Sequence, residues 1–188
     1  GLSDIQQSLA TSVWGLTTAI AAAIVAVLAV VLGPIADYSA TKKKFLAFFV
    51  ALGVLASCFL VTVGHGAWVL CVLLYIAGRI GFSGANIFYD SLLPHVARED
   101  EIDQVSSKGY ALGYLGGGVL LAINILMIML APEGEVLGIS WTEFMTRLSF
   151  VTVGVWWLVF SIPLFRHVPE PPGAAIEGPL LNLSLIHI

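Results

Sequence analysis

Charge is the scarcest property of this chain. Only 11% of its 188 residues are Asp, Glu, Lys or Arg, whereas roughly a quarter of a soluble domain is charged. Hydrophobic residues make up 59% of the chain, and the mean hydropathy is +0.97. So little charge cannot cover a protein surface in water, and a net charge of −4 without a basic face argues against nucleic acid as a partner. The composition therefore indicates an integral membrane protein surrounded by lipid.

Catalytic and metal-binding patterns are also lacking. The two cysteines, Cys58 and Cys71, lie in separate apolar runs and have neither metal-ligand spacing nor an evident disulfide partner. The four histidines are scattered, and there is no His-Glu-x-x-His pair, phosphate-binding loop or nucleophile elbow. We therefore expect no enzyme, no cofactor and no metal.

What the sequence does contain is a set of five long apolar runs. They cover residues 12–32, 45–63, 68–88, 110–130 and 148–165. Each is near the roughly 20 residues with which a helix crosses the hydrocarbon core. Inside lipid the backbone polar groups must be satisfied within the segment, and the alternation of a membrane barrel is missing. The sequence predicts an all-α polytopic helical bundle.

Lysine and arginine predict the orientation of these spans. Loops 33–44, 94–109 and the segment from 166 onward would share one side of the membrane, and this side carries Lys42, Lys43, Lys44, Arg98, Lys108 and Arg166. The opposite side comprises the loops of residues 1–11, 64–67 and 131–147, and it carries only Arg147. Because positive charge favours the cytoplasmic side, we expect the chain to start outside and end in the cytoplasm.

Both ends suggest a piece of a longer protein. Five spans that begin outside imply at least one further span before Gly1, which is not a methionine. We interpret residues 169–182, which begin with a proline-rich stretch, as the start of a cytoplasmic linker. Residues 183–188 resemble a translated sequencing adapter, and we interpret them as an artefact.

Arg79 is the most informative single residue. It lies near the middle of the third run, where an arginine costs about 2.5–3.5 kcal/mol by insertion scales. At about 100° per residue it shares one helical stripe with other polar side chains, namely Tyr75, Ser83, Asn86 and Asp90. The stripe predicts a water-filled pathway; the alternative is an arginine in a buried structural ion pair.

Small residues recur at four-residue intervals in the fourth run. Gly109, Gly113 and Gly117 are spaced in this way, with Gly116 and Gly118 beside them. Such spacing lets two helices approach closely, either as static packing or as a moving interface. Asn124 in the same run is either an interhelical hydrogen-bonding residue or a substrate contact.

A short loop motif joins the first two runs. It begins with Gly33, contains Asp37, and ends in the basic cluster Lys42, Lys43 and Lys44. Asp37 is either a plain loop acid or a carboxylate that complements the N-terminus of a neighbouring helix. The motif is suited to a short cytoplasmic loop between two membrane spans.

This loop resembles the Gly-x-x-x-Asp-Arg-x-Gly-Arg-Arg loop of the major facilitator superfamily, although Tyr38 and Ala40 replace the first arginine and the second glycine. Two further stretches, Phe88-Tyr-Asp-Ser-Leu-Leu-Pro-His95 and Val105-Ser-Ser-Lys-Gly-Tyr-Ala-Leu-Gly-Tyr-Leu-Gly-Gly-Gly118, are similar to its vacuole-effluxer branch. The eukaryotic members of that branch are autophagy-related vacuolar amino-acid exporters. The resemblance covers about residues 12–168.

The resemblance implies the major facilitator fold, with these runs as spans two to six of twelve and residues 12–168 as most of the N-terminal half. The run with Arg79 would be span four, which lines the cavity in such transporters. The implied function is secondary transport of small solutes, amino acids among them, by alternating access, with a coupling proton and the missing C-terminal half as partners. The alternatives are a drug or sugar facilitator and a non-transporting membrane module. Alanine- and glycine-rich spans with terse loops favour a bacterial inner membrane.

Overall fold

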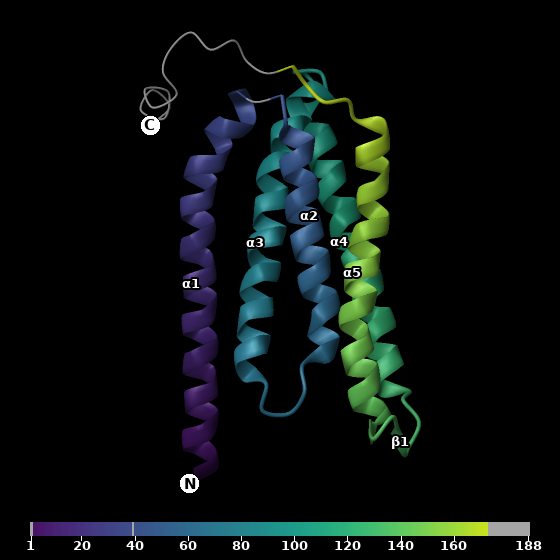
Figure 1. Cartoon of the computed structure of the whole chain (residues 1–188). Helices are drawn as coiled ribbons and strands as arrows, with labels where there is room; N and C mark the ends of the chain where they lie inside the picture. Colours follow the sequence, from purple (N-terminus) through teal and green to yellow (C-terminus); the bar gives the residue numbers. More distant parts are fainter. Residues whose placement is uncertain (1, 39, 173–188) are drawn as a thin grey trace.

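In the described part of the chain, five long helices run up and down side by side in a bundle (Figure 1). The computed structural model describes residues 2–38 and 40–172. The helices are α1 (Leu2–Tyr38), α2 (Lys42–Phe59), α3 (Trp68–Leu92), α4 (Ile102–Met129) and α5 (Trp141–His167). All five are long and apolar enough to cross a membrane. The prediction of an all-α polytopic membrane protein is confirmed.

Short elements connect the helices. The 3₁₀ turns η1 (Leu60–Thr62) and η2 (Leu93–His95) extend α2 and α3. Strands β1 (Glu135–Val136) and β2 (Ile139–Ser140) pair antiparallel between α4 and α5. Leu137 and Gly138 between them both have positive φ, at 53° and 79°, as a tight two-residue hairpin requires.

Helix α1 is longer than its apolar run at both ends. Residues 1–11, expected as a loop, are helical from Leu2 onward, and the hydroxyls of Thr11 and Ser12 bond to carbonyls four residues earlier. The helix also continues through Gly33 and Pro34, where a loop was expected. A proline removes one backbone donor, and membrane helices tolerate that loss.

Helices α4 and α5 begin earlier than expected, at Ile102 and Trp141 rather than at residues 110 and 148. The start of α5 is capped by the Ser140 hydroxyl, which accepts a hydrogen bond from the backbone N–H of Glu143 at 3.2 Å. An apolar run marks only the part of a helix that lies in lipid. The polar first turns of α4 and α5 were therefore not predicted as helix from hydropathy.

The core lies where α2 and α3 meet, near the end of the bundle that carries the lysine cluster. Phe88 is fully buried, and its ring stacks against those of Phe45 and Phe49, with centroids 5.1 and 5.8 Å apart. Further along, a Cβ added to Gly81 would lie only 2.5 Å from the backbone nitrogen of Gly53. Glycine therefore permits the close approach of these two helices.

Helices α1 and α5 pack against this pair, and α4 packs against α5. Helix α1 packs along α3, where the rings of Trp14 and Tyr75 lie 4.4 Å apart. Helix α5 packs along α2, and α4 contacts α5. The α4–α5 contact includes a hydrogen bond of 2.8 Å from the Thr152 hydroxyl to the Asn124 side-chain oxygen, which is the first of the two alternatives given for Asn124.

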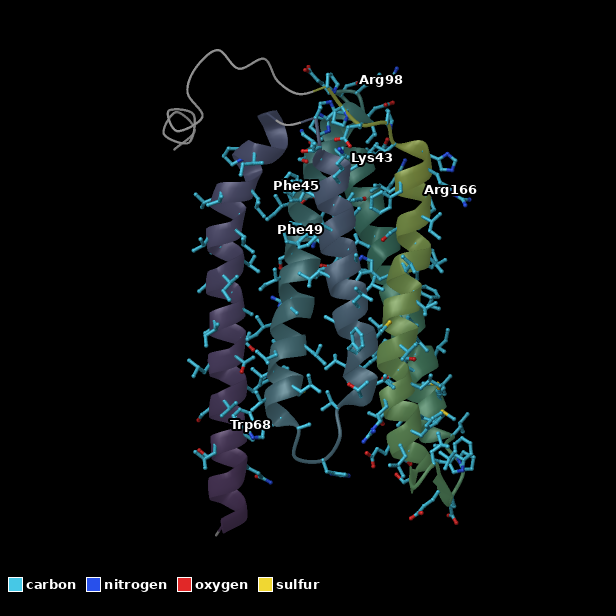
Figure 2. All side chains as sticks on the ribbon, in the orientation of Figure 1. Lys43, Phe45, Phe49, Trp68, Arg98 and Arg166 are labelled. Carbon is cyan, nitrogen blue, oxygen red and sulfur yellow. The ribbon has the colours of Figure 1, made fainter. Side chains whose placement is uncertain are left out.

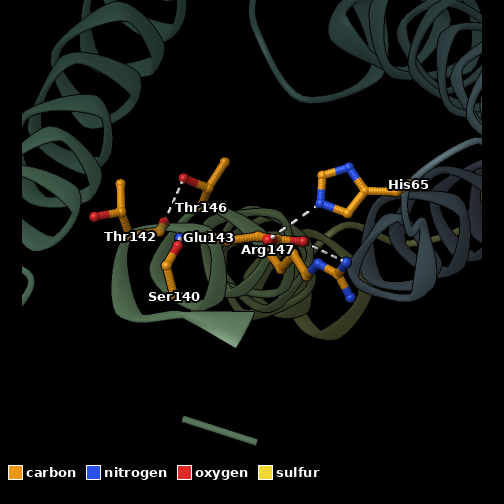
Figure 3. A network of polar contacts seen from close by, with 6 residues as sticks. All are labelled: His65, Ser140, Thr142, Glu143, Thr146 and Arg147. Atoms are coloured by element: carbon orange, nitrogen blue, oxygen red, sulfur yellow. Dashed lines mark hydrogen bonds and ion pairs between the residues drawn. The ribbon is translucent and has the colours of Figure 1, made fainter. Parts of the chain in front are cut away.

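A polar network joins the α2–α3 loop to the start of α5 at the end opposite the lysine cluster (Figure 3). Arg147 donates to the Glu143 carboxylate at 2.6 Å, and His65 lies 3.5 Å from the same carboxylate. The His65 side chain is 93% exposed, whereas those of Glu143 and Arg147 are largely covered. The Glu143–Arg147 pair is therefore the firmer part of this network.

Candidate transport pathway

The residues of the polar stripe of α3 do not share one environment. Tyr75 is half-buried against Trp14 of α1. Arg79 is exposed, and its guanidinium makes no hydrogen bond or ion pair within the described part of the chain. Ser83 is half-buried, while Asn86 and Asp90 are exposed. At 1.5 Å per residue, Arg79 and Asp90 are roughly 16 Å apart along the helix.

A groove of about 420 Å³ separates α3 from α4. Asn86 and Asp90 line it from α3, and Ser106, Tyr110 and Tyr114 line it from α4. The Tyr110 hydroxyl faces the Asp90 carboxylate. The structure therefore brings two predicted stripe residues together with hydroxyl groups of a second helix.

The tyrosine hydroxyl groups of α4 were not among the site residues predicted from the sequence. Tyr110 and Tyr114 directly follow Gly109 and Gly113 in the sequence. The two tyrosines are therefore also four residues apart, and both line the groove from α4. A tyrosine pair at this spacing, in an otherwise apolar run, is the signal that could have identified them.

A second groove of about 460 Å³ lies between α3 and α5. It is lined mostly by apolar side chains, and Ser161 of α5 is one of its few polar residues. Asn86 and Tyr89 line both grooves. Asn86 therefore stands at the point where the two hollows meet.

The glycines of α4 lie in two kinds of surroundings. A Cβ on Gly109 would meet the Tyr89 hydroxyl at 3.4 Å, and one on Gly116 would meet the Trp156 ring at 3.9 Å. Gly113, Gly117 and Gly118 have open space around them within the described chain. A close helix–helix contact along this side of α4 thus remains a prediction.

Two lysines of the loop motif, Lys42 and Lys43, hold three helix ends together, and Figure 2 labels Lys43 at this end of the bundle. The Lys42 ammonium is buried and bonds to the Ser91 carbonyl at 3.3 Å. Lys43 donates to the carbonyls of Phe165 and Val168 at 2.9 and 2.7 Å, while its backbone N–H donates to the Glu170 carboxylate.

The other residues of the loop motif lie at the end of α1. Gly33 is half-buried within that helix, with open space beside its Cα. Asp37 belongs to the last turn of α1, but its side chain lies outside the described part of the structure. The predicted linker beyond Pro172 and residues 183–188 also lie outside the described residues.

The bonds of Lys42 and Lys43 connect the start of α2 to the ends of α3 and α5. This arrangement is favourable because the carbonyl groups at a helix C-terminus attract cations.

Comparison with known proteins agrees with this architecture. The family described as vacuole effluxer Atg22 like matches residues 6–103 and 100–186. YxiO of Bacillus subtilis (strain 168), named as an MFS-type transporter, is 40% identical over 168 residues, which are 89% of this chain and 39% of the relative. Autophagy-related protein 22 of Kluyveromyces lactis is 27% identical over 136 residues, 66% of this chain and 26% of the relative.

A second fungal relative, autophagy-related protein 22 of Coccidioides immitis, is 24% identical over 211 residues, 83% of this chain and 34% of the relative. No solved structure matches the chain. The chain thus spans less than half the length of these relatives. These matches, together with five membrane-length helices in the described part of the chain, show that it belongs to the vacuole effluxer family of multi-pass, MFS-type membrane transporters.

Proposed function

We propose that this chain is most of the N-terminal half of a secondary transporter that moves small solutes by alternating access. Amino acids and similar metabolites are the first substrates to test, and a bacterial inner membrane is the proposed location. The B. subtilis relative is more than twice as long as this chain. The rest of the protein would supply the opposing half, and the two halves would rock around a site near the midplane.

The observation that supports this proposal best is Arg79. A cation in the middle of a span normally faces a partner acid or water, because lipid raises its free energy by about 2.5–3.5 kcal/mol or more. Within the described residues its guanidinium has no acidic partner and its side chain is exposed. An aqueous pathway accounts for both facts, and a guanidinium in such a pathway could pair with an anionic group of the substrate.

Asn86 and Asp90 extend the proposed pathway toward the cytoplasmic end of α3. Asn86 offers both a donor and an acceptor at the meeting point of the two grooves. Asp90 beside Tyr110 offers a carboxylate that could bind an amine or carry a coupling proton. We assign to Arg79, Asn86 and Asp90 contact with the substrate, the coupling proton or the opposing half.

The test is Arg79→Ala in the complete protein, reconstituted in proteoliposomes and assayed with a panel of radiolabelled metabolites. We expect loss of uptake with normal membrane insertion, whereas Arg166→Ala, a matched change at an exposed arginine at the end of α5 (Figure 2), should leave uptake intact. Normal uptake by the Arg79 variant would remove this arginine from the mechanism.

The same reconstituted protein distinguishes this proposal from the two alternative functions. A drug or sugar facilitator would be stabilised against heat by those compounds and not by amino acids. A membrane module without transport activity would be stabilised by no solute in the panel and would show no uptake.

A further inference from the structure

A third groove, of about 520 Å³, runs between α1 and α2. Both helices pack on α3 and have few contacts with each other, and the groove lies between the end of α1 and the start of α2. Its walls are apolar side chains, and its cytoplasmic end holds Thr41 and Lys44. The apolar residues are Leu28, Leu32, Phe45, Phe48 and Phe49, and Figure 2 shows Phe45 and Phe49 on the side of α2 toward α1.

This groove is separate from the proposed pathway. None of the polar residues of the α3 stripe lines it, since its walls come only from α1, α2 and the turn between them. Phe48 is 61% exposed, so the groove opens outward along the bundle surface. In a membrane such a surface is covered by lipid chains.

Lys44 differs from the two lysines before it. The ammonium groups of Lys42 and Lys43 bond to helix-end carbonyls. Lys44 is exposed, and within the described residues its ammonium forms no hydrogen bond or ion pair. It also lies in the first turn of α2, where the helix dipole adds positive potential. The Lys44 ammonium, which has no partner among the described residues, therefore lies at the cytoplasmic end of an apolar groove.

We propose that this groove binds an anionic phospholipid of the cytoplasmic leaflet. One acyl chain would lie along Leu28, Leu32 and Phe48, and the headgroup phosphate would pair with Lys44. The orientation fits, because the lysine cluster marks the cytoplasmic side, where anionic lipids collect. From Thr41 to Phe49 the groove follows α2 for roughly 12 Å, at 1.5 Å per residue, enough for a large part of one acyl chain.

The selectivity of this site comes from the headgroup. Lipid tails are as apolar as the groove, so chain contacts alone hardly distinguish one phospholipid from another. A basic residue near the membrane surface contributes about 1 kcal/mol of attraction to anionic lipid, which is a preference of about fivefold. The inference does not depend on which solute is transported.

The test is native mass spectrometry of the complete protein in detergent, with phosphatidylglycerol and phosphatidylcholine that carry identical acyl chains. In Lys44→Gln we expect the preference for phosphatidylglycerol to fall about fivefold. Lys108→Gln is the matched control, since Lys108 is an exposed lysine of α4, also near the cytoplasmic end. Equal losses in both variants, or none in Lys44→Gln, would overturn the proposal.

A second pair of variants tests the groove. Leu28→Trp would fill it, and Leu16→Trp places the same ring on an exposed position of α1 away from it. We expect the preferred phosphatidylglycerol to be lost in Leu28→Trp and retained in Leu16→Trp. Retention in Leu28→Trp would show that the lipid is held elsewhere. A result of this kind would leave the transport proposal unaffected, because the Arg79 variant is measured by uptake.

Discussion

Replacement of Gly81 by alanine should separate α2 from α3. The added Cβ would lie 2.5 and 2.6 Å from the backbone nitrogen and Cα of Gly53, and 2.9 Å from the Phe49 carbonyl oxygen. All three are backbone atoms of α2, so no side chain can rotate away to make room. The helix itself must move by about 1 Å to restore ordinary contact, and gaps of this size already forfeit a quarter to a half of the dispersion energy of nearby atom pairs.

The size of the effect follows from two opposing terms. Overpacking of a well-packed interface costs about 1–3 kcal/mol, and the rigidity of the backbone here favours the upper end. Alanine in place of a helical glycine returns up to about 1 kcal/mol. We therefore expect Gly81→Ala to lower the free energy of unfolding by about 2 kcal/mol.

Gly78 is the matched control for this prediction. It lies on α3 one turn before Gly81, but a Cβ there would meet only the Ala56 Cβ, at 3.9 Å. Gly78→Ala should be neutral or stabilising by up to about 1 kcal/mol, so the two variants should differ by roughly 3 kcal/mol.

The assay is unfolding of the complete protein in mixed micelles, with increasing mole fraction of sodium dodecyl sulfate and circular dichroism as the signal. Equal unfolding curves for Gly78→Ala and Gly81→Ala would refute the close approach of α2 and α3 at Gly53.

Two further predictions concern polar contacts and use the same assay. Lys43→Ala removes both bonds to the end of α5 and should cost about 1–2 kcal/mol, whereas Lys44→Ala removes none and should stay within about 0.5 kcal/mol. Equal losses of unfolding free energy in the two variants would contradict the assignment of Lys43 as the lysine that holds α2 to the end of α5. Asn124→Ala and Thr152→Val should each destabilise the protein, with a coupling energy of about 0.6 kcal/mol in a double-mutant cycle; additive losses would show that the bond does not form in the membrane.

The sequence was sufficient for those parts of the fold that depend on composition along one helix. Five apolar runs give five membrane-length helices, because transfer into lipid depends on the hydropathy of each segment separately. The stripe from Arg79 to Asp90 follows from helical periodicity alone, and α3 is indeed a continuous helix over it.

Helix ends were less predictable, for a physical reason. Hydropathy reports where lipid begins, whereas a helix ends where its backbone finds other hydrogen-bond partners. Helix α1 therefore passes through Gly33 and Pro34, and α5 begins at Trp141 because the Ser140 hydroxyl caps it.

Properties that depend on pairs of helices could not be predicted from one sequence. The three lysines of the loop motif are indistinguishable in the chain, yet Lys42 binds the end of α3, Lys43 binds the end of α5, and Lys44 stands at an apolar groove. Likewise, Tyr110 gains its place in the candidate pathway only because α4 lies across a groove from α3.

The most direct test of the account is the accessibility of Ser83 to water. In a complete protein whose Cys58 and Cys71 are replaced, Ser83→Cys keeps Arg79 in place and tests the middle of the polar stripe. We expect a membrane-impermeant thiol reagent to modify this cysteine from at least one side of the membrane, while Val155→Cys, an exposed apolar position of α5, stays unmodified. A cysteine at position 83 that is protected from both sides would contradict an aqueous pathway along α3.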